Sequence, residues 1–366
     1  MSDVVILIVF LLVTVYLALL VFFIRGWKKT PFADANSLTT DVRLKPSVVI
    51  CCKNEAQHLP ALIDALKNQS YQHFELIWVN DHSTDVTQQI LEASLDFFPD
   101  AQIISSPAPG KKKAQQAGIL AANGNFIVTT DADCIPRTKW IETLVAFQLQ
   151  QQADMIIAPV KLHKGTNLFS KLQQLEFATL VGSGMGAAGS GMPIFCNAAN
   201  MAFTKNAWLE SVADLQEEEP SGDDVFLLHS IKRRNGKVAV LKSMEAIVLT
   251  GYQKTLKAFV RQRVRWASKS SKYRDGHIIT TGLIIAAVNL LLLGLLFVAI
   301  VMPQYWLMWF VVFLLKYCVD YLFLLHIKPF FQMKFSFVTV FLLSILYPFY
   351  IAGIGILSLL QKNTRW

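Results

Sequence analysis

Charged residues are scarce in this chain, and its cysteines are few and irregularly spaced. Of its 366 residues, 16% are charged and 53% are hydrophobic, and the mean hydropathy of +0.41 excludes an ordinary soluble enzyme. The five cysteines fit neither the spacing of a zinc site nor that of a redox pair, so we expect free thiols in a reducing compartment. Internal repeats and low-complexity tracts are also lacking, so a repeat architecture is not expected.

The apolar residues are concentrated towards the two ends of the chain. Four runs are long enough to cross a bilayer: Val4–Ile24, Ile278–Met302, Tyr305–Leu325 and Phe335–Leu360. The third run is interrupted by Lys316 and Asp320, which lie four residues apart and therefore share one helix face. We expect these two charges to pair and to face protein or a hydrated cavity rather than lipid.

Basic residues stand directly beside the first two apolar runs. No basic segment precedes the first run and no small-residue cleavage site follows it, so we expect a retained helix rather than a signal peptide. Arg25, Lys28 and Lys29 then place the N-terminus outside and the middle of the chain in the cytosol. Lys254–Arg274 carries eight lysines and arginines before the second run. The net charge of +8 therefore suggests contact with anionic lipid headgroups rather than with nucleic acid.

This pattern predicts an integral protein of the cytoplasmic (inner) membrane with a cytosolic domain. We expect a membrane helix at residues 1–25, a linker at 26–45, an α/β domain at 46–250, a basic amphipathic interfacial helix at 251–276 and a membrane region of about three spans at 277–366. Four full spans would put the C-terminus outside, whereas Lys362 and Arg365 favour the inside. Pro348 could also break the last run into a re-entrant element, so the side of the C-terminus stays open.

Short apolar runs alternate with helical patterns in the middle domain. Strands are predicted at Ser47–Cys52, Phe74–Asn80, Ala101–Ser105 and Asn125–Thr130, and helices at Leu59–Asn68, Val86–Phe97 and Lys111–Ala122. Repeated units of this length indicate an α/β fold, with a parallel sheet covered by helices. Ligands bind outside the carboxyl ends of the strands in such sheets, and polar clusters stand at those ends here.

Two aspartates, Asp131 and Asp133, directly follow the last of these strands. Both carboxylates can turn towards one ligand if the chain leaves the strand at this point. They would suit a hard divalent cation such as Mg²⁺ or Mn²⁺, which in turn binds phosphate oxygens. Considered alone, the pair is better explained by a solvated turn, because surface loops often contain two such aspartates. Asp81, at the end of the second strand, is likewise either a ligand or a turn residue.

Three further polar clusters each have a functional and a structural interpretation. Lys111–Lys113 begins a helix, where the positive charge opposes the helix dipole, so either a bound diphosphate or a solvated basic turn is indicated. Asp223 and Asp224 precede another helix and either cap it or supply a base. Gln262–Trp266 lies in a basic, partly apolar helix that could also serve as an interfacial membrane anchor.

The clusters occur together and in a fixed order along the chain. The successive segments are VVICCKNEA, VNDHSTD, TDADC, GDDVFLL and QRVRW. They resemble the signatures of membrane-bound family 2 glycosyltransferases with the GT-A fold and a Q-x-x-R-W motif. That group includes ceramide glucosyltransferases and the synthases of hyaluronan, chitin, cellulose and poly-N-acetylglucosamine. The resemblance covers about Pro46–Trp266 and implies a cytosolic GT-A domain of the α/β class with flanking transmembrane helices.

The resemblance implies a role for each cluster. The nucleoside would be contacted by Asn54, Glu55 and Asp81, and Asp131 would lie near the ribose and diphosphate. Mg²⁺ or Mn²⁺ would be bound by Asp133 together with Asp131. The diphosphate would be held by Lys113, Gln262 and Arg265, and Trp266 would border the acceptor pocket. Asp224 matches the general base of the family. Asp223 stands where the family usually has glutamate, and its shorter side chain would shift the acceptor. The expected donor is a nucleotide-sugar, with a UDP-sugar as the first choice.

The implied mechanism is inverting and direct. Asp224 removes the proton from an acceptor hydroxyl as that oxygen attacks the anomeric carbon, without a covalent enzyme intermediate. The cation and Arg265 stabilise the leaving diphosphate. We expect a membrane lipid as acceptor, because four spans are few for a polymer channel. A small processive synthase of the poly-N-acetylglucosamine or hyaluronan type is the alternative, and an inactive membrane scaffold is a more remote one.

The segment between the sheet and the base carries three further expectations. Asn167–Leu180 is predicted to form an amphipathic helix, and the glycine-rich Gly182–Gly191 is interpreted as a mobile gate or a plain linker. Cys196–Asn200 corresponds in position to the acceptor-side segment of the family. In the membrane region, Lys316 and Asp320 either fix helix packing or line the acceptor's access path.

Overall fold

The computed structural model describes residues 3–33, 44–215 and 223–360. The chain divides into two compact units. One, the helical unit, comprises Met1–Lys29, Lys164–Ile194 and Tyr252–Thr364. The other, the sheet unit, comprises Thr30–His163 and Phe195–Gly251. Each unit is therefore assembled from separate segments of the chain.

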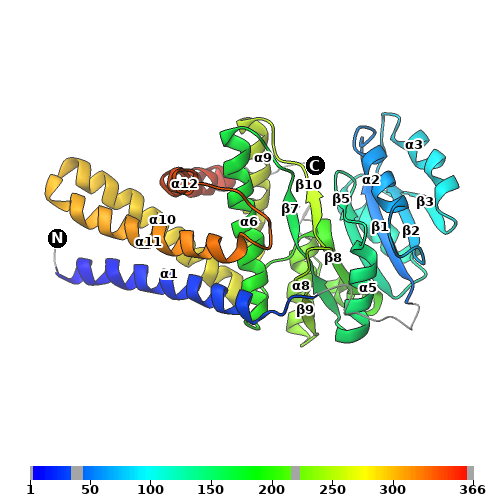
Figure 1. Ribbon diagram of the computed structural model, residues 1–366, viewed down its shortest axis with the longest axis horizontal. Coiled ribbons are helices and arrows are strands. Elements are labelled where there is room, and N and C mark those ends of the chain that lie inside the picture. Colours follow the sequence, from blue (N-terminus) through cyan, green and yellow to red (C-terminus); the bar gives the residue numbers. More distant parts are fainter. Residues whose placement is uncertain (1–2, 34–43, 216–222, 361–366) are drawn as a thin grey trace. The chain divides into compact units, whose positions relative to one another are not determined.

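A seven-stranded sheet forms the centre of the sheet unit (Figure 1). Its strand order is β3-β2-β1-β4-β8-β6-β9, with β1 at Pro46–Cys52, β2 at Glu75–Asn80, β3 at Ala101–Ser105, β4 at Phe126–Asp131, β6 at Met155–Ile157, β8 at Met201–Thr204 and β9 at Val238–Val240. Strands β1 to β4 confirm the four predicted strands and run parallel, as the alternation of strand and helix predicted. The predicted helices are also present, as α2 at Leu59–Lys67, α3 at Thr87–Ser94 and α4 at Lys111–Ala121.

The register of the parallel strands brings three strand ends together. β1 lies between β2 and β4, with Cys52 opposite Asn80 and Cys51 opposite Asp131. The carboxyl ends of β1, β2 and β4 therefore lie side by side at one end of the strands. Residues that directly follow these strands, such as Asp81, meet at that end, which is where parallel sheets bind ligands.

The strands are apolar on both sides because both faces of the sheet are covered. In β1, Val48 and Ile50 are fully buried, and Val49 on the opposite face is 2% exposed. Gly118 lets α4 lie directly on the sheet, since a Cβ atom there would come within 2.5 Å of the Val49 side chain and 2.8 Å of the Val79 side chain. This close approach positions the first turn of α4 at the strand ends.

The far part of the sheet departs from the purely parallel arrangement that the sequence predicted. β8 is antiparallel to both β4 and β6. A second sheet contains β5 at Ile135–Pro136, β10 at Val248–Thr250 and β7 at Val160–Leu162. The strands missed from the sequence have two to four residues, which is too short to show a period. Helices α5 at Trp140–Gln151, α7 at Lys205–Ser211 and α8 at Asp223–Arg233 complete this unit.

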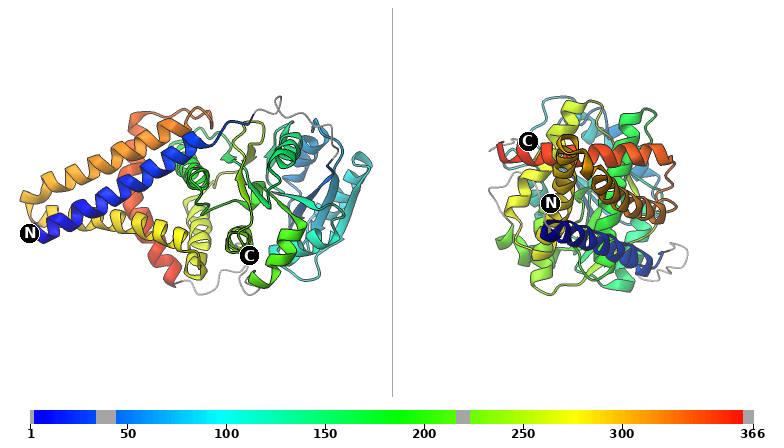
Figure 2. Two further views of the ribbon diagram at one scale, coloured as in Figure 1. Left: turned by 90° about the horizontal axis from the view of Figure 1, so that it is seen from below. Right: turned by 90° about the vertical axis from the view of Figure 1, so that its left-hand side faces the viewer.

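In the helical unit, three long helices run side by side (Figure 1). They are α1 at Asp3–Lys29, α10 at Gly276–Val301 and α11 at Trp306–Ile327. Two other helices, α6 at Leu168–Gly189 and α12 at Phe337–Leu360, run across them, as the views in Figures 1 and 2 show. The short helix α9 at Leu256–Ala267 packs against α12.

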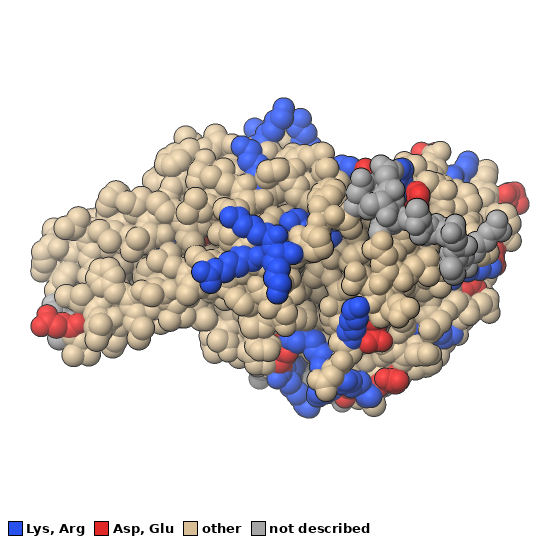
Figure 3. Space-filling view, turned by 60° about the horizontal axis from the view of Figure 1, so that its bottom comes forward, with Lys and Arg blue, Asp and Glu red and all other residues tan. Residues whose placement is uncertain are grey.

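Four helices of this unit are long and apolar enough to cross a membrane, and they coincide with the four predicted runs. Their lengths are 27 residues for α1, 26 for α10, 25 for Pro303–Ile327 and 24 for α12, whereas about 20 residues span a bilayer. On the face drawn in Figure 3, the end of this unit that carries the N-terminus of α1 shows no lysine or arginine. Apart from an acidic patch at its tip, the drawn surface of this end is uncharged, which is what lipid tails require of a protein.

The interpretation of Gly182–Gly191 as a mobile gate or a linker was wrong, because α6 continues through this segment to Gly189. A Cβ atom on Gly186 would lie 2.5 Å from the carbonyl oxygen of Phe23, and one on Gly26 would lie 1.8 Å from the carbonyl oxygen of Gly186. The missing side chains therefore let α1 and α6 cross with their backbones in contact. This packing offsets the roughly 1 kcal/mol that each glycine costs a helix.

The predicted ion pair in α11 is confirmed. Lys316 Nζ lies 2.5 Å from Asp320 Oδ2, and Lys316 is 2% exposed. Tyr16 of α1 donates a hydrogen bond of 2.5 Å to Asp320 Oδ1, so each carboxylate oxygen has a partner. Polar groups buried among apolar helices are thus satisfied by one another. This arrangement favours the helix-packing interpretation of the pair over an access path.

Candidate active site

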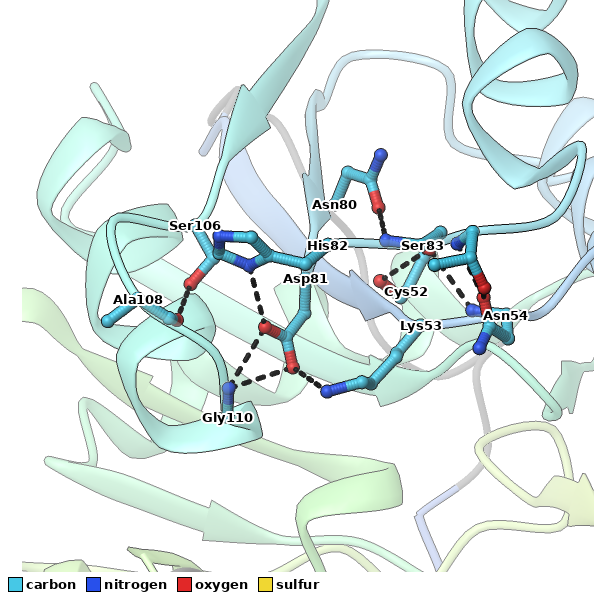
Figure 4. Close-up of polar contacts among 11 residues, drawn as sticks. Cys52, Lys53, Asn54, Asn80, Asp81, His82, Ser83, Ser106, Ala108 and Gly110 are labelled. Atoms are coloured by element: carbon cyan, nitrogen blue, oxygen red, sulfur yellow. Dashed lines mark hydrogen bonds and ion pairs between the residues drawn. The ribbon is translucent and has the colours of Figure 1, made fainter.

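Asp81 contacts three segments at the carboxyl ends of the parallel strands (Figure 4). It is 1% exposed, and its backbone N–H donates to the carbonyl of Cys52 at 2.8 Å. Its two carboxylate oxygens accept from the backbone N–H of Gly110 at 2.9 and 3.0 Å. Lys53 Nζ lies 3.5 Å from Oδ2, and His82 Nδ1 lies 3.3 Å from Oδ1. The carboxylate therefore holds the ends of β1 and β2 against the start of α4.

Gly110 makes this connection possible at the start of α4. Its φ of +124° is a backbone conformation that side chains rarely allow, and nothing lies within 4 Å of the position a Cβ atom would take. In this conformation its N–H points at Asp81. The Pro109-Gly110 dipeptide marks the turn in the sequence.

Asn54 and Glu55 follow β1 at the same end of the strands, and both make contacts within the surrounding loops. Asn54 Oδ1 accepts from the backbone N–H of Thr84 at 2.8 Å, while Glu55 Oε2 lies 2.7 Å from His58 Nδ1. Burial raises the pKa of Glu55; the hydrogen bond from His58 opposes this rise, and the charge of Asp133 adds to it. Glu55 therefore lies within electrostatic reach of the predicted metal ligands.

Asp131, Asp133 and Cys134 form the group best placed to hold a metal ion. One ligand atom from each lies within 4.8 Å of the others. Burial, followed by the charge of Asp131, raises the pKa of Asp133, as expected where two carboxylates share one site. Burial also raises the pKa of Cys134, and a neutral thiol is a poor ligand for a hard cation. The two carboxylates thus fit Mg²⁺ or Mn²⁺, which would neutralise both.

Two lysines at the start of α4 form ion pairs with carboxylates of the site. Lys111 forms an ion pair with Asp131, and Lys112 Nζ lies 3.0 Å from Asp223 Oδ1. Burial lowers the pKa of Lys111, but the charge and hydrogen bond of Asp131 together with the charges of Cys51 and Asp224 outweigh it, so the pKa lies above its usual value. All three lysines were candidates from the sequence and Lys113 was the expected one, because adjacent lysines look alike until the helix face is known. The diphosphate role of Lys113 stays a prediction.

Asp224 lies at the start of α8, where it is held from two sides. Its Oδ1 accepts from the backbone N–H of Val225 at 2.9 Å, and its Oδ2 accepts from that of Ala198 at 3.2 Å. The charge of Asp224 also helps to raise the pKa of Lys111, so the two groups lie near each other. The side chain thus has the local contact of a cap together with a place beside the charged cluster. Gly222 of the same motif lies outside the described residues.

The pKa of the half-buried Cys51 thiol depends on several of these charges. Burial raises the pKa of Cys51 to about 12. Lys111 opposes the rise, whereas Asp131, Asp81 and Asp223 reinforce it. Charges from the ends of β2 and β4 and from the starts of α4 and α8 therefore surround one point at the end of β1.

The segment Cys196–Asn200 is held in place by hydrogen bonds of the Asn200 side chain. Asn200 is fully buried, and its Oδ1 accepts from Trp140 Nε1 at 2.9 Å. Its Nδ2 donates to the carbonyls of Pro159 and Ala246, both at 2.7 Å. This network holds the 3₁₀ turn Ala198–Asn200 in place, and with it the N–H that binds the Asp224 carboxylate.

A small, open pocket lies beside the Lys112–Asp223 pair. Its other walls include Gln115 of α4, Phe203 of β8, Trp208 of α7 and Leu227 of α8. This pocket could not be expected from the sequence, because β8 and α7, which form two of its walls, were not predicted.

The other predicted site residues, Gln262, Arg265 and Trp266, lie on α9 in the helical unit. Gln262 Oε1 accepts a hydrogen bond of 2.6 Å from Arg263, and the Trp266 ring centroid lies 6.4 Å from that of Phe177. Their roles towards diphosphate and acceptor stay predictions.

Comparison with known proteins finds relatives for part of the sequence. Residues 47–213 match the family model described as Glycosyl transferase family 2. An uncharacterized glycosyltransferase of Haemophilus influenzae is 32% identical over 102 residues, which are 28% of this chain and 32% of that protein. An undecaprenyl-phosphate 4-deoxy-4-formamido-L-arabinose transferase of Yersinia pestis is 32% identical over 133 residues, or 35% of this chain and 40% of that protein. The chain thus spans less than half the length of these relatives.

A solved structure is similar over nearly the whole chain. The mannosyltransferase PcManGT from Pyrobaculum calidifontis, determined in complex with GDP-Man and Mn²⁺, aligns with 97% of this chain and 99% of its own at a TM-score of 0.54. At 15% sequence identity, this likeness shows a common fold. With the family match, it confirms the α/β fold that the sequence predicted.

Proposed function

We propose, on the premise that residues 47–213 form a family 2 glycosyltransferase domain with the GT-A fold, that this protein is an inverting glycosyltransferase. It would transfer a sugar from a nucleotide-sugar, expected to be a UDP-sugar, to a hydroxyl group of a lipid in the membrane. One observation carries the proposal. Asp131, Asp133 and Asp224, together with Lys111, gather where the parallel strands of the sheet unit end.

In this proposal, the residues that follow β1, β2 and β4 bind the nucleotide-sugar donor. Asp131 and Asp133 would hold Mg²⁺ or Mn²⁺, which when bound supplies charge to stabilise the leaving diphosphate. Lys113 would bind the same diphosphate, and Asn54, Glu55 and Asp81 would border the nucleoside. The complex of PcManGT with GDP-Man and Mn²⁺ supports a nucleotide-sugar and a divalent cation as a class.

On the acceptor side, Asp224 would act as the general base. A carboxylate oxygen of Asp224 takes the proton from the acceptor hydroxyl while that hydroxyl oxygen forms its bond to the anomeric carbon. The bond between that carbon and the diphosphate oxygen breaks, and the electron pair leaves with the diphosphate. The backbone N–H of Ala198 keeps the Asp224 carboxylate oriented, and Lys112 balances the charge of the neighbouring Asp223.

The membrane helices support a lipid as the acceptor. Four helices of the helical unit are apolar enough to cross a bilayer, and the Yersinia relative is by its name a transferase to undecaprenyl phosphate. In this proposal Gln262 and Arg265 contribute to the diphosphate site, and Trp266 borders the acceptor pocket. By the positive-inside rule, the sheet unit would lie in the cytosol.

Mass spectrometry of lipid extracts tests the proposal. Membranes with and without the protein are incubated with a panel of nucleotide-sugars in the presence of Mg²⁺ or Mn²⁺. The expected result is a new lipid heavier by one sugar residue with a single donor. A ladder of products would indicate the alternative processive synthase. Neither transfer nor donor hydrolysis across the panel would refute the enzyme assignment and favour a scaffold.

A further inference from the structure

The second residue of the Q-R-V-R-W segment, Arg263, is buried, unlike the other basic residues of α9. Arg263 is 3% exposed, whereas Lys257 and Arg261 on the same helix are exposed and Arg265 is half-buried. The guanidinium of an arginine ordinarily remains in contact with water or another polar medium. The burial of Arg263 therefore calls for partners inside the protein.

Those partners satisfy the guanidinium on all sides. Arg263 Nε donates to Glu176 Oε1 at 3.2 Å, and its Nη2 donates to Glu176 Oε2 at 2.6 Å, which makes a bidentate pair between α9 and α6. Tyr350 of α12 donates a further hydrogen bond of 3.2 Å to Glu176 Oε1. The guanidinium carbon also lies 4.6 Å from the ring centroid of Phe259 and 4.3 Å from that of Trp266. Arg263 is therefore fixed in one orientation.

The remaining amino group of Arg263, Nη1, forms a hydrogen bond with the side chain of Gln262. Arg263 Nη1 donates a hydrogen bond of 2.6 Å to Gln262 Oε1. Because a guanidinium has donors and no acceptor, the carboxamide must present its oxygen to Arg263, and its NH₂ group is turned away. That NH₂ group offers two N–H donors and no acceptor, and its chemical complement is an oxygen-rich anion such as phosphate.

We propose that Arg263 is a positioning residue that holds the Gln262 carboxamide with its NH₂ group presented to a phosphate. The inference rests on the proposed function, because that function supplies the phosphate from one of two sources, the diphosphate of the donor or the headgroup of a lipid. Without Arg263 the Gln262 side chain could rotate about its three torsions and flip its amide. Arg263 thus acts through Gln262 and not by touching the substrate.

A double-mutant cycle on the full-length protein tests this coupling. Gln262→Ala, Arg263→Lys and the double variant are compared by the KM for the donor and the KM for the acceptor. Arg263→Lys keeps the charge beside Glu176, but a single ammonium cannot make the same fork of hydrogen bonds. We expect each single variant to raise one KM by about tenfold or more, the size expected for a charge-assisted hydrogen bond. The double variant should match Gln262→Ala alone, because both changes remove the same contact.

Which KM rises identifies the source of the phosphate: the donor's diphosphate if the donor KM rises, and a lipid headgroup if the acceptor KM rises. The matched control is Tyr350→Phe, which removes a hydrogen bond from the same Glu176 but leaves Arg263 on Gln262. It should lower the Tm without changing either KM. Effects of Gln262→Ala and Arg263→Lys that multiply in the double variant would overturn the proposal, since Arg263 would then only hold α9 to α6.

A further variant keeps the test decisive if Arg263→Lys does not fold. Gln262→Glu still accepts from Arg263, so it should fold, but it replaces the outward NH₂ group by an oxygen that repels phosphate. An unchanged KM for both substrates in Gln262→Glu would overturn the proposal. Failure of the proposed function would be visible separately, as a wild-type protein that neither transfers sugar nor binds UDP or GDP with Mn²⁺ in calorimetry.

Discussion

Replacement of the proposed base by its amide, Asp224→Asn, should separate catalysis from folding. The asparagine is nearly isosteric with aspartate but cannot take a proton from the acceptor hydroxyl. General-base catalysis contributes roughly 10²- to 10⁴-fold, so we expect turnover to fall by at least about 10²-fold. The donor affinity should stay similar, because the change removes an interaction made in the transition state.

The contacts of Asp224 set the size of the competing structural effect. Asparagine can still accept from the Ala198 N–H through its carbonyl oxygen, but its NH₂ group cannot accept from the Val225 N–H. Loss of one hydrogen bond of this kind costs about 1 kcal/mol of folding free energy. A 10²-fold loss of turnover corresponds to about 2.7 kcal/mol of transition-state stabilisation. The kinetic effect should therefore exceed the effect on stability and appear in protein that is still folded.

The measurements are the initial rate of lipid glycosylation, donor affinity by calorimetry and the Tm. Glu75→Gln is a suitable control, because Glu75 is 2% exposed and accepts hydrogen bonds from Ser47 and Asn123 at the opposite edge of the sheet. It should lower the Tm while turnover per folded molecule is kept. Turnover of Asp224→Asn within a few-fold of wild type would mean that Asp224 only caps α8. A loss seen with hydroxyl acceptors but not with an already ionised phosphate acceptor would identify the lipid's phosphate as the nucleophile.

Three further predictions concern the metal site and the helical unit. Excess EDTA should abolish transfer, and Asp133→Ala should weaken donor binding in calorimetry with Mn²⁺; full activity in EDTA would contradict the metal site. Because Lys316 and Asp320 form an ion pair, Lys316→Asp or Asp320→Lys alone should reduce the yield of folded protein. The double swap should restore that yield. Normal yields of both single variants would argue against a packing role. Gly26→Ala should lower the Tm, since its Cβ would lie 1.8 Å from a carbonyl oxygen of α6, whereas Gly282→Ala, with nothing within 4 Å, should not; equal Tm values would refute the close crossing.

The order of strands and helices around the site could be predicted because it depends on local patterns. The apolar runs that became β1, β2 and β4 each end in polar residues, and the parallel register then brings those residues to one edge. Asp81 and Asp131 could therefore be placed from the sequence alone. The partners of these aspartates could not, since the contact of Lys111 with Asp131 depends on the face that α4 turns to the sheet.

Two other features depended on tertiary contacts that a single sequence does not display. The glycines after Leu180 suggested a flexible segment by composition, but contact with the α1 backbone keeps that segment helical. Arg263 appeared to be one more basic residue of an interfacial helix. Its burial depends on Glu176, which is 87 residues earlier in the chain.

The interleaved path of the chain limits how the protein can be taken apart. Residues 164–194 leave the sheet unit after β7 and rejoin it before β8, having contributed α6 to the other unit. A fragment that holds the sheet unit alone therefore cannot be made by trimming the two ends of the chain. It would also require excision of this internal loop and a new linker from His163 to Phe195. The same connectivity means that part of the helical unit is encoded between two segments of the sheet unit, so neither unit corresponds to one continuous stretch of the sequence.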